Sequence, residues 1–252
     1  MQANQSPLNV IAVTEVATAV PAFIGYTQKA KKLDIDLTRT PVLISSLAEY
    51  TEYFGLPENE NNIEVVLSGA AAATSVSVQF TPGETGNPHN MYYALQLFFD
   101  NGGGDCYIVS AGATSVLGLI DPAQLKMALD VLQNEQQPTL IIFPEAVQGL
   151  NDAGYGLLIS AALAQCKASA NRFAILDVKS DNTKSIDDNA AVFRNLVTGI
   201  PDLLSYGAAY FPYVKTTLNY SYVDSGINII DKRSATVTTT RLSDLQTTDN
   251  ML

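Results

Sequence analysis

The sequence contains little of what most enzymes and nucleic-acid-binding proteins depend on. Among its 252 residues there is one histidine, there are two cysteines, and there is no tryptophan. Only 15% of the residues are charged, against about 25% in a typical globular protein. Acidic residues outnumber basic ones by 25 to 14, so the formal net charge is −11. An acidic chain repels phosphate backbones, so we expect no nucleic-acid binding, and the low charge favours association into an oligomer.

The cysteines and the apolar runs predict an ordinary globular chain. Cys106 and Cys166 lie far apart and lack metal-ligand spacing, so buried free thiols are expected. No apolar run approaches the ~20 residues that a membrane helix needs. The first residues lack the basic flank and apolar core of a signal peptide. We therefore expect no membrane insertion.

The single histidine limits the acid–base chemistry that the chain can perform. His89 lies between Pro88 and Asn90 at the expected start of a helix, so a helix-start or surface role is favoured over a general base. The sequence contains no Gly-x-Ser-x-Gly elbow, zinc motif, calcium loop or dinucleotide fingerprint. These observations predict no catalytic residues, no metal and no cofactor.

Asp177 is the best catalytic candidate if the chain is an enzyme. It stands near the end of an expected parallel strand, and ligand sites in open α/β sheets lie at that edge. Together with Asp105 and Glu145 it would form a carboxylate metal site. Acidic residues at strand ends also cap helices and pair with lysines, and Lys179 is close in sequence. We therefore predict that Asp177 is structural.

Alternating strand and helix patterns predict an α/β fold with a mostly parallel sheet flanked by helices. Gly25, inside the first expected strand, indicates close approach of another backbone. Residues 58–88 change character and predict a small β-rich insertion that forms a hairpin. Residues 231–252 are polar and threonine-rich, so we expect an arm, a loop or a poorly ordered tail. Strands are expected at 21–27, 41–44, 106–109, 139–143, 173–178, 206–211 and 227–230.

A glycine-rich turn stands at the centre of the chain. An apolar helical stripe in residues 91–100 is followed by Asn101, by Gly102, Gly103 and Gly104, and then by a β-favouring run. Phosphate-binding loops have the opposite order, in which a strand precedes the glycines and a helix follows them. The order here favours a helix end and a tight structural turn.

Several stretches of the chain resemble contractile tail sheath proteins, which form the outer sheath of contractile phage tails and of related bacterial injection systems. The most specific is YYALQLFFDNGGGDCYIVSAG, at 92–112. The others, which keep the family's order, are VATAVPAFIGYTQKA at 16–30, PVLISSLAEYTEYFG at 41–55 and GAAYFPYVK at 207–215. The sequence departs from the family's pattern in two places. The family's Pro-Gly-Val-Tyr opening has no counterpart in these residues, and neither has its C-terminal domain.

The resemblance implies a structural subunit without a reaction of its own. Such subunits polymerise as stacked six-fold rings around an inner tube and drive it into a target envelope on contraction. The implied partners are further copies of the chain, the inner tube protein, the baseplate and the tail terminator or cap proteins. The implied location is the bacterial cytoplasm during assembly, and then a virion tail or phage tail-like particle.

The resemblance also implies a division of the chain. We expect a sheath core domain at 16–57 and 89–215, the insertion at 58–88, an N-terminal arm at 1–15, and a β-run with a polar tail at 216–252. Extended arms in the family add strands to neighbouring subunits. Possible interface residues are therefore Val10, Ile11 and Val13 in the arm, and Tyr220 and Tyr222 in the tail, because tyrosine tolerates both apolar contact and water. Two alternatives remain, a non-contracting cap or baseplate-proximal component and an α/β small-molecule enzyme.

Overall fold

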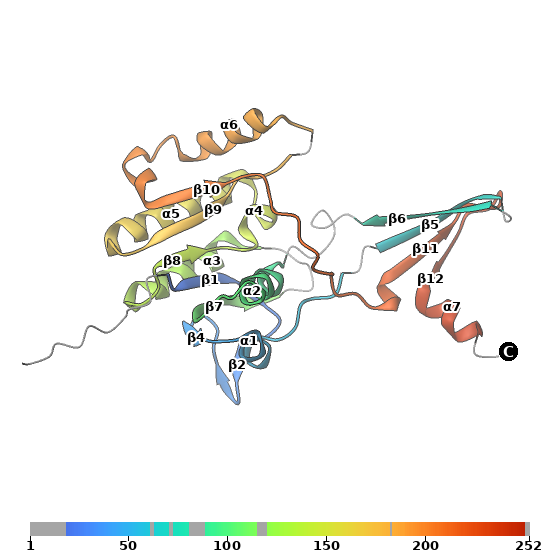
Figure 1. The fold of residues 1–252 in the computed structure, drawn as a ribbon, viewed down its shortest axis with the longest axis horizontal. Helices are drawn as coiled ribbons and strands as arrows, with labels where there is room; N and C mark the ends of the chain where they lie inside the picture. Colours follow the sequence, from blue (N-terminus) through green and yellow to red (C-terminus); the bar gives the residue numbers. More distant parts are fainter. Residues whose placement is uncertain are drawn as a thin grey trace, which may run out of the picture.

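A mostly parallel six-stranded sheet forms the body of the protein (Figure 1). The computed structural model describes residues 19–60, 63–70, 73–80, 89–114, 120–181 and 183–249. Neighbouring strands run parallel, except that β4 is antiparallel to β7. The predicted α/β class is confirmed. The strand order is β10 (Gly207–Tyr210), β9 (Phe173–Asp177), β8 (Leu140–Ile142), β1 (Pro21–Thr27), β7 (Cys106–Ala113) and β4 (Val42–Ile44).

Strand β1 is buried along its whole length because both faces of the sheet are covered. Its side chains alternate between two apolar clusters. Ala22, Ile24 and Tyr26 join the cluster formed with α3 (Pro122–Asp130) and α5 (Asp152–Ser169). Phe23 joins the cluster formed with α1 (Leu47–Phe54) and α2 (Met91–Asp100). This period-two alternation explains why the strand is apolar at almost every position.

Polar side chains cap the first turns of several helices. The Ser46 hydroxyl accepts the Glu49 backbone N–H at 3.2 Å, and the Glu49 carboxylate accepts the Ser45 N–H at 2.7 Å. Asp121 caps α3. Ser185 caps α6 (Ile186–Val197), which packs against α5. Short helical segments complete the connections, namely η1 (Val131–Asn134), α4 (Ala146–Gly149), η2 (Pro201–Tyr206) and η3 (Asp224–Gly226).

The glycine turn between α2 and β7 is confirmed, and its glycines have different roles. Gly102 has φ +84°, which is the left-handed conformation that favours glycine. Gly103 makes a close approach, because a Cβ atom there would lie 2.5 Å from Cε1 of Phe98. A Cβ atom on Gly104 would meet no other atom within 4 Å. Gly102 is therefore needed for its left-handed backbone conformation, whereas Gly103 is needed because the Phe98 ring leaves no room for a side chain.

A second, four-stranded sheet extends to one side of the body (Figure 1). The predicted hairpin is present as β5 (Ile63–Ala70) and β6 (Ala73–Phe80), which pair antiparallel. The predicted β-run is present as β11 (Ile227–Asp231), and it pairs in parallel with β5. The insertion and the C-terminal part of the chain therefore build one sheet together.

One segment that was expected to be irregular has regular structure. The prediction of an arm, a loop or a poorly ordered tail at 231–252 is wrong for β12 (Thr238–Arg241) and α7 (Leu242–Asp249). Strand β12 pairs antiparallel with β11, and its threonines suit a strand. Between β1 and β4 the chain also forms a small antiparallel hairpin, β2 (Lys31–Lys32) with β3 (Ile35–Asp36). The predicted arm at 1–15 lies outside the described residues.

The last two glycines of the turn provide a matched pair of substitutions. Replacing Gly103 with valine should lower the free energy of unfolding by roughly 1–3 kcal/mol, because the new side chain must displace the Phe98 ring. That ring packs against Phe23 and Phe99. Replacing Gly104 with alanine meets open space and should change stability little. Urea denaturation measures both, and equal stabilities of the two variants would contradict the assignment.

Candidate functional site

The carboxyl ends of β1 and β8 form the topological switch point of the central sheet. These strands are neighbours, but the chain proceeds from β1 toward β7 and from β8 toward β9, in opposite directions. Open α/β sheets bind ligands in the crevice that such a reversal creates. This edge is therefore where a functional site is expected on grounds of topology.

A buried carboxylate fills this crevice. Glu145 follows β8 and is completely buried. Its Oε2 accepts the backbone N–H of Tyr26 at 2.8 Å, which ties the end of β1 to the loop after β8. A Cβ atom on Gly25 would lie 2.9 Å from that oxygen and 2.8 Å from Cε of Met91. Gly25 thus makes room for side chains, and the prediction that a second backbone approaches it is wrong.

His89 lies beside this carboxylate. Its Nδ1 is 3.6 Å from Glu145 Oε1, and the residue is only 7% exposed. The predicted position at the start of a helix is confirmed, since α2 begins at Met91, but a surface location is wrong. Burial raises the pKa of the Glu145 carboxyl, and the contacts with His89 and with the Tyr26 amide oppose that rise. Burial and the nearby Glu145 charge also raise the pKa of Tyr50.

The His89–Glu145 pair has almost no open space beside it. The adjoining hollow, lined by Tyr26, Tyr50 and Met91 among others, has a volume of about 10 Å³. A single water needs about 10–15 Å³, so the hollow has no room for an organic substrate. The arrangement is that of an internal polar contact that fixes the sheet edge. The sequence signal for it was a glutamate directly after an apolar strand.

A larger hollow opens farther along the same edge. It has a volume of about 640 Å³ and lies between α2, the loop after β8, the end of β9 and the segment 213–220. That segment belongs to the extended connection from β10 to the second sheet (Figure 1). Its size is within the usual range for small-molecule sites. Asp177 lines the hollow, and burial raises the pKa of its carboxyl.

The three acidic residues that could form a metal site are not brought together. Asp177 ends β9, Glu145 is turned into the interior, and Asp105 precedes β7 at the opposite edge of the sheet. Over the described residues, no group of three or more His, Cys, Asp or Glu side chains is placed to hold a metal ion. Lys179 pairs with Asp152 at 3.0 Å instead of with Asp177.

Two tyrosine hydroxyls hold the backbone around Asp177. The Tyr155 hydroxyl donates to the Asp177 carbonyl at 2.7 Å. The Tyr213 hydroxyl donates to the Val178 carbonyl at 2.8 Å and accepts the Ser180 N–H at 3.1 Å. These bonds fix the backbone where β9 ends, and the structural role of the Asp177 carboxylate stays a prediction.

The predicted interface tyrosines lie on the extended connection. Tyr220 packs edge-on against Tyr93, with ring centroids 5.3 Å apart, and the Tyr93 hydroxyl accepts the Ser221 N–H at 2.7 Å. Tyr222 is 56% exposed. Their interface role stays a prediction, and Val10, Ile11 and Val13 lie outside the described residues.

The outer edge of the second sheet is an additional surface that sequence reasoning missed. Strand β6 is an edge strand in the described part of the chain. Its residues include no charge, proline or glycine, and Val76 and Val78 are 63% and 64% exposed. Natural proteins usually protect long edge strands with such residues, because an open edge pairs readily with another chain. Strand β6 therefore has the properties of a pairing surface.

Comparison of the sequence with models of known protein families and with curated proteins gave no match. Within the described ranges, no helix combines the length and apolar character needed to cross a membrane.

The buried carboxylate makes a specific prediction about pH. A raised pKa in the folded state means that folding favours the protonated form of Glu145. The free energy of unfolding gained from protonated Glu145 is fully present below the ordinary glutamate pKa of 4.5. It is lost as pH rises through the higher pKa that the carboxyl has in the folded state. Glu145→Gln retains an oxygen for the Tyr26 amide and removes the titration. Its stability relative to the wild type should therefore increase as pH rises.

Chemical denaturation from just above the pI of about 4.4 to mildly alkaline pH measures this difference. Asp105→Asn is the control, because Asp105 is exposed and its replacement leaves the buried pair intact. A difference between Glu145→Gln and wild type that stays constant with pH would show that the burial argument is wrong.

Proposed function

We propose that this chain is a structural subunit of a contractile sheath. In this proposal it polymerises as stacked rings around an inner tube and drives the tube into a target envelope on contraction. Its partners are further copies of itself, the inner tube protein, the baseplate and the tail terminator or cap proteins. The particle is a virion tail or a phage tail-like injection system, assembled in the bacterial cytoplasm.

The observation that carries the proposal is the placement of the stretches that resemble the family. The three longest stretches supply β1, then β4 with α1, and then α2, the glycine turn and β7. These elements pack together in one apolar cluster, which includes Phe23, Ile44, Phe54, Leu95 and Ile108. Stretches that are separate in the sequence thus form one side of one core, as expected if the resemblance reflects a common fold.

Strand β6 provides the physical basis for polymerisation. An unprotected edge strand with exposed valines gains main-chain hydrogen bonds when a strand from another subunit is added. Such bonds link subunits through a narrow strip of backbone, so the folded bodies can rotate relative to one another. A sheath that changes between two packings requires this kind of connection.

The alternatives draw less support from the geometry. An enzyme would have to work with a buried His89–Glu145 pair that has no room beside it, or with Asp177 in the hollow of about 640 Å³, where no group of His, Cys, Asp or Glu among the described residues is placed to hold a metal ion. A cap or baseplate-proximal component would have the same body, and it differs from a sheath subunit in forming one ring instead of a stack.

Charges on the β6 edge should prevent assembly without unfolding the chain. Because Val76 and Val78 are exposed, replacing both with lysine should change stability by only about 0.5 kcal/mol. Lysine on an edge strand opposes strand addition, so the variant should remain monomeric under conditions in which the wild type assembles. Analytical ultracentrifugation measures this. Leu157→Lys, at an exposed position on α5, is the matched control and should assemble normally. Assembly of the double variant at the wild-type level would contradict the role of β6.

The N-terminal arm can be tested independently. Deleting residues 1–15 should leave a soluble monomer that no longer assembles, because the proposed arm adds a strand to a neighbouring subunit. Electron microscopy of the full-length assembly should show ordered six-fold rings. Polymers formed by the truncated chain would refute the arm. A monomeric full-length chain with an intrinsic activity that Asp177→Ala abolishes would favour the enzyme alternative.

A further inference from the structure

Asp177 is the one acidic side chain among the described residues that line the hollow of about 640 Å³. Successive side chains of a strand point to opposite faces, and Leu176 joins the apolar cluster with α3 and α5. Asp177 therefore shares the other face of β9 with Ile175. Ile175 pairs in register with Ile142, which packs against the cluster formed with α1 and α2. The Asp177 side chain thus lies on the face of the sheet where α2 borders the hollow.

Within the described part of the chain, no positive group compensates the Asp177 carboxylate. Burial raises the pKa of this carboxyl, and no cation or hydrogen-bond donor among the described residues opposes the rise. Lys179 pairs with Asp152, and the Tyr155 hydroxyl binds the backbone of Asp177 instead of its side chain. A partly buried carboxylate without a partner is costly in its ionised form. A ligand that brings a positive charge would remove this cost.

The rest of the wall supplies mainly apolar and aromatic surface. Two of its amides satisfy each other, since Asn90 Nδ2 donates to Gln148 Oε1 at 2.7 Å. Lys215 also lines the hollow, but it is exposed, and a long lysine side chain can keep its charge in water. Aromatic rings attract organic cations as well as apolar groups. The apolar and aromatic lining includes Tyr93, Leu97, Val147, Tyr213 and Tyr220.

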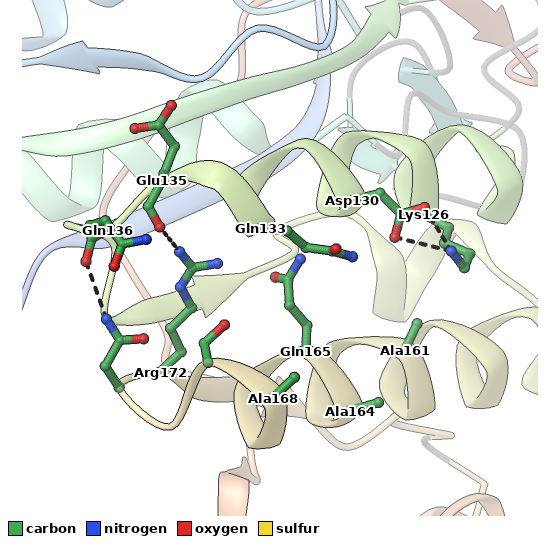
Figure 2. A pocket seen from close by; sticks show the side chains of 12 residues that line it. Lys126, Asp130, Gln133, Glu135, Gln136, Ala161, Ala164, Gln165, Ala168 and Arg172 are labelled. Carbon is green, nitrogen blue, oxygen red and sulfur yellow. Dashed lines mark hydrogen bonds and ion pairs between the residues drawn. The ribbon is translucent and has the colours of Figure 1, made fainter.

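A second hollow, of about 550 Å³, lies between α3 with η1 and α5 (Figure 2). On its wall Lys126 and Asp130 pair with each other at 2.7 Å. The buried charge next to it is the guanidinium of Arg172, which donates to the main-chain carbonyls of Pro138 and Glu135. That charge is positive and opposes the binding of another cation. The two hollows therefore differ in the sign of their buried charge.

We propose that the hollow beside Asp177 binds a small organic ammonium compound. The charged nitrogen of the ligand donates to the Asp177 carboxylate, and its apolar body lies against the side chains of Tyr93 and Leu97. A hydrogen bond between two opposite charges is stronger than one between neutral groups, so the charged nitrogen decides which ligand binds. The Asp177 backbone is structural in this proposal, and its carboxylate is the binding group. The inference concerns binding without a reaction, and it does not depend on the sheath proposal.

The experiment uses the full chain and two small probes of nearly the same shape. Phenethylammonium presents a positive nitrogen on an aromatic body, and 2-phenylethanol presents a neutral hydroxyl in its place. Titration with phenethylammonium at neutral pH should give saturable NMR shifts of the backbone amides of Asp177 and Leu97. The alcohol should bind at least about tenfold more weakly, because it brings no charge to the carboxylate.

Three charge variants locate the ammonium group. Asp177→Asn keeps the shape of the side chain and should abolish the preference for phenethylammonium, so that the two probes bind alike. Lys215→Gln removes a like charge from the lining and should tighten binding of phenethylammonium by about twofold, without changing that of the alcohol. Asp105→Asn is the matched control, because Asp105 is exposed at the opposite edge of the sheet. It removes the same charge from the chain and should bind as the wild type does.

The outcomes separate a built site from general attraction of a cation to an acidic chain. The proposal is overturned if phenethylammonium gives no saturable shift, or if the alcohol binds equally well. It is also overturned if Asp177→Asn retains the preference, or if Asp105→Asn weakens binding as much as Asp177→Asn does. The Lys215→Gln result keeps the test open to refutation if Asp177→Asn fails to fold, because unchanged or weaker binding of phenethylammonium in that variant would contradict the proposal.

Discussion

The pairing of β1 with strands on both sides is the constraint on which the rest of the structure depends. β1 is bonded to β7 and to β8, and each face of the sheet around it is covered by helices. A central parallel strand with both faces buried must be apolar almost throughout, and it leaves polar groups only at its ends. The carboxyl end of β1 is therefore where backbone hydrogen bonds must be completed by something other than a strand.

Glu145 completes the backbone hydrogen bonds at the carboxyl end of β1. The crevice expected at this edge of the sheet is therefore filled by an ordered polar contact. The Glu145 carboxylate holds the Tyr26 amide, His89 lies beside it, and Gly25 provides the space that the side chains of Glu145 and Met91 occupy. Burying these groups costs free energy, which their mutual contacts offset in part. Farther along, Tyr155 and Tyr213 hold the backbone around Asp177 in the same way. The carboxyl edge of the central sheet is thus held by fixed polar contacts, and β6 forms an open edge of the second sheet in the described part of the chain.

The sequence predicted features that depend on local chemistry and failed where distant segments decide. The glycine turn follows from a short pattern, and the parallel sheet follows from the alternation of apolar strands and helices. Strand β12 was not predicted. It pairs with β11, and β11 in turn pairs with β5, so the sheet that holds β12 is built on a hairpin far earlier in the chain. The buried His89–Glu145 contact was missed for the same reason. A glutamate that follows an apolar strand can lie at the surface or in the interior, and only the fold brings Glu145 and His89 together.

The central claim is that this body is a repeating unit of a sheath around a tube. Negative-stain electron microscopy of particles from the native source, labelled with an antibody against this chain, tests it most directly. The account predicts sheathed tubes in long and short forms, with label along the whole sheath. Label confined to one end of the particle would indicate a cap or baseplate component. Isolated globular particles without tubes would contradict the account.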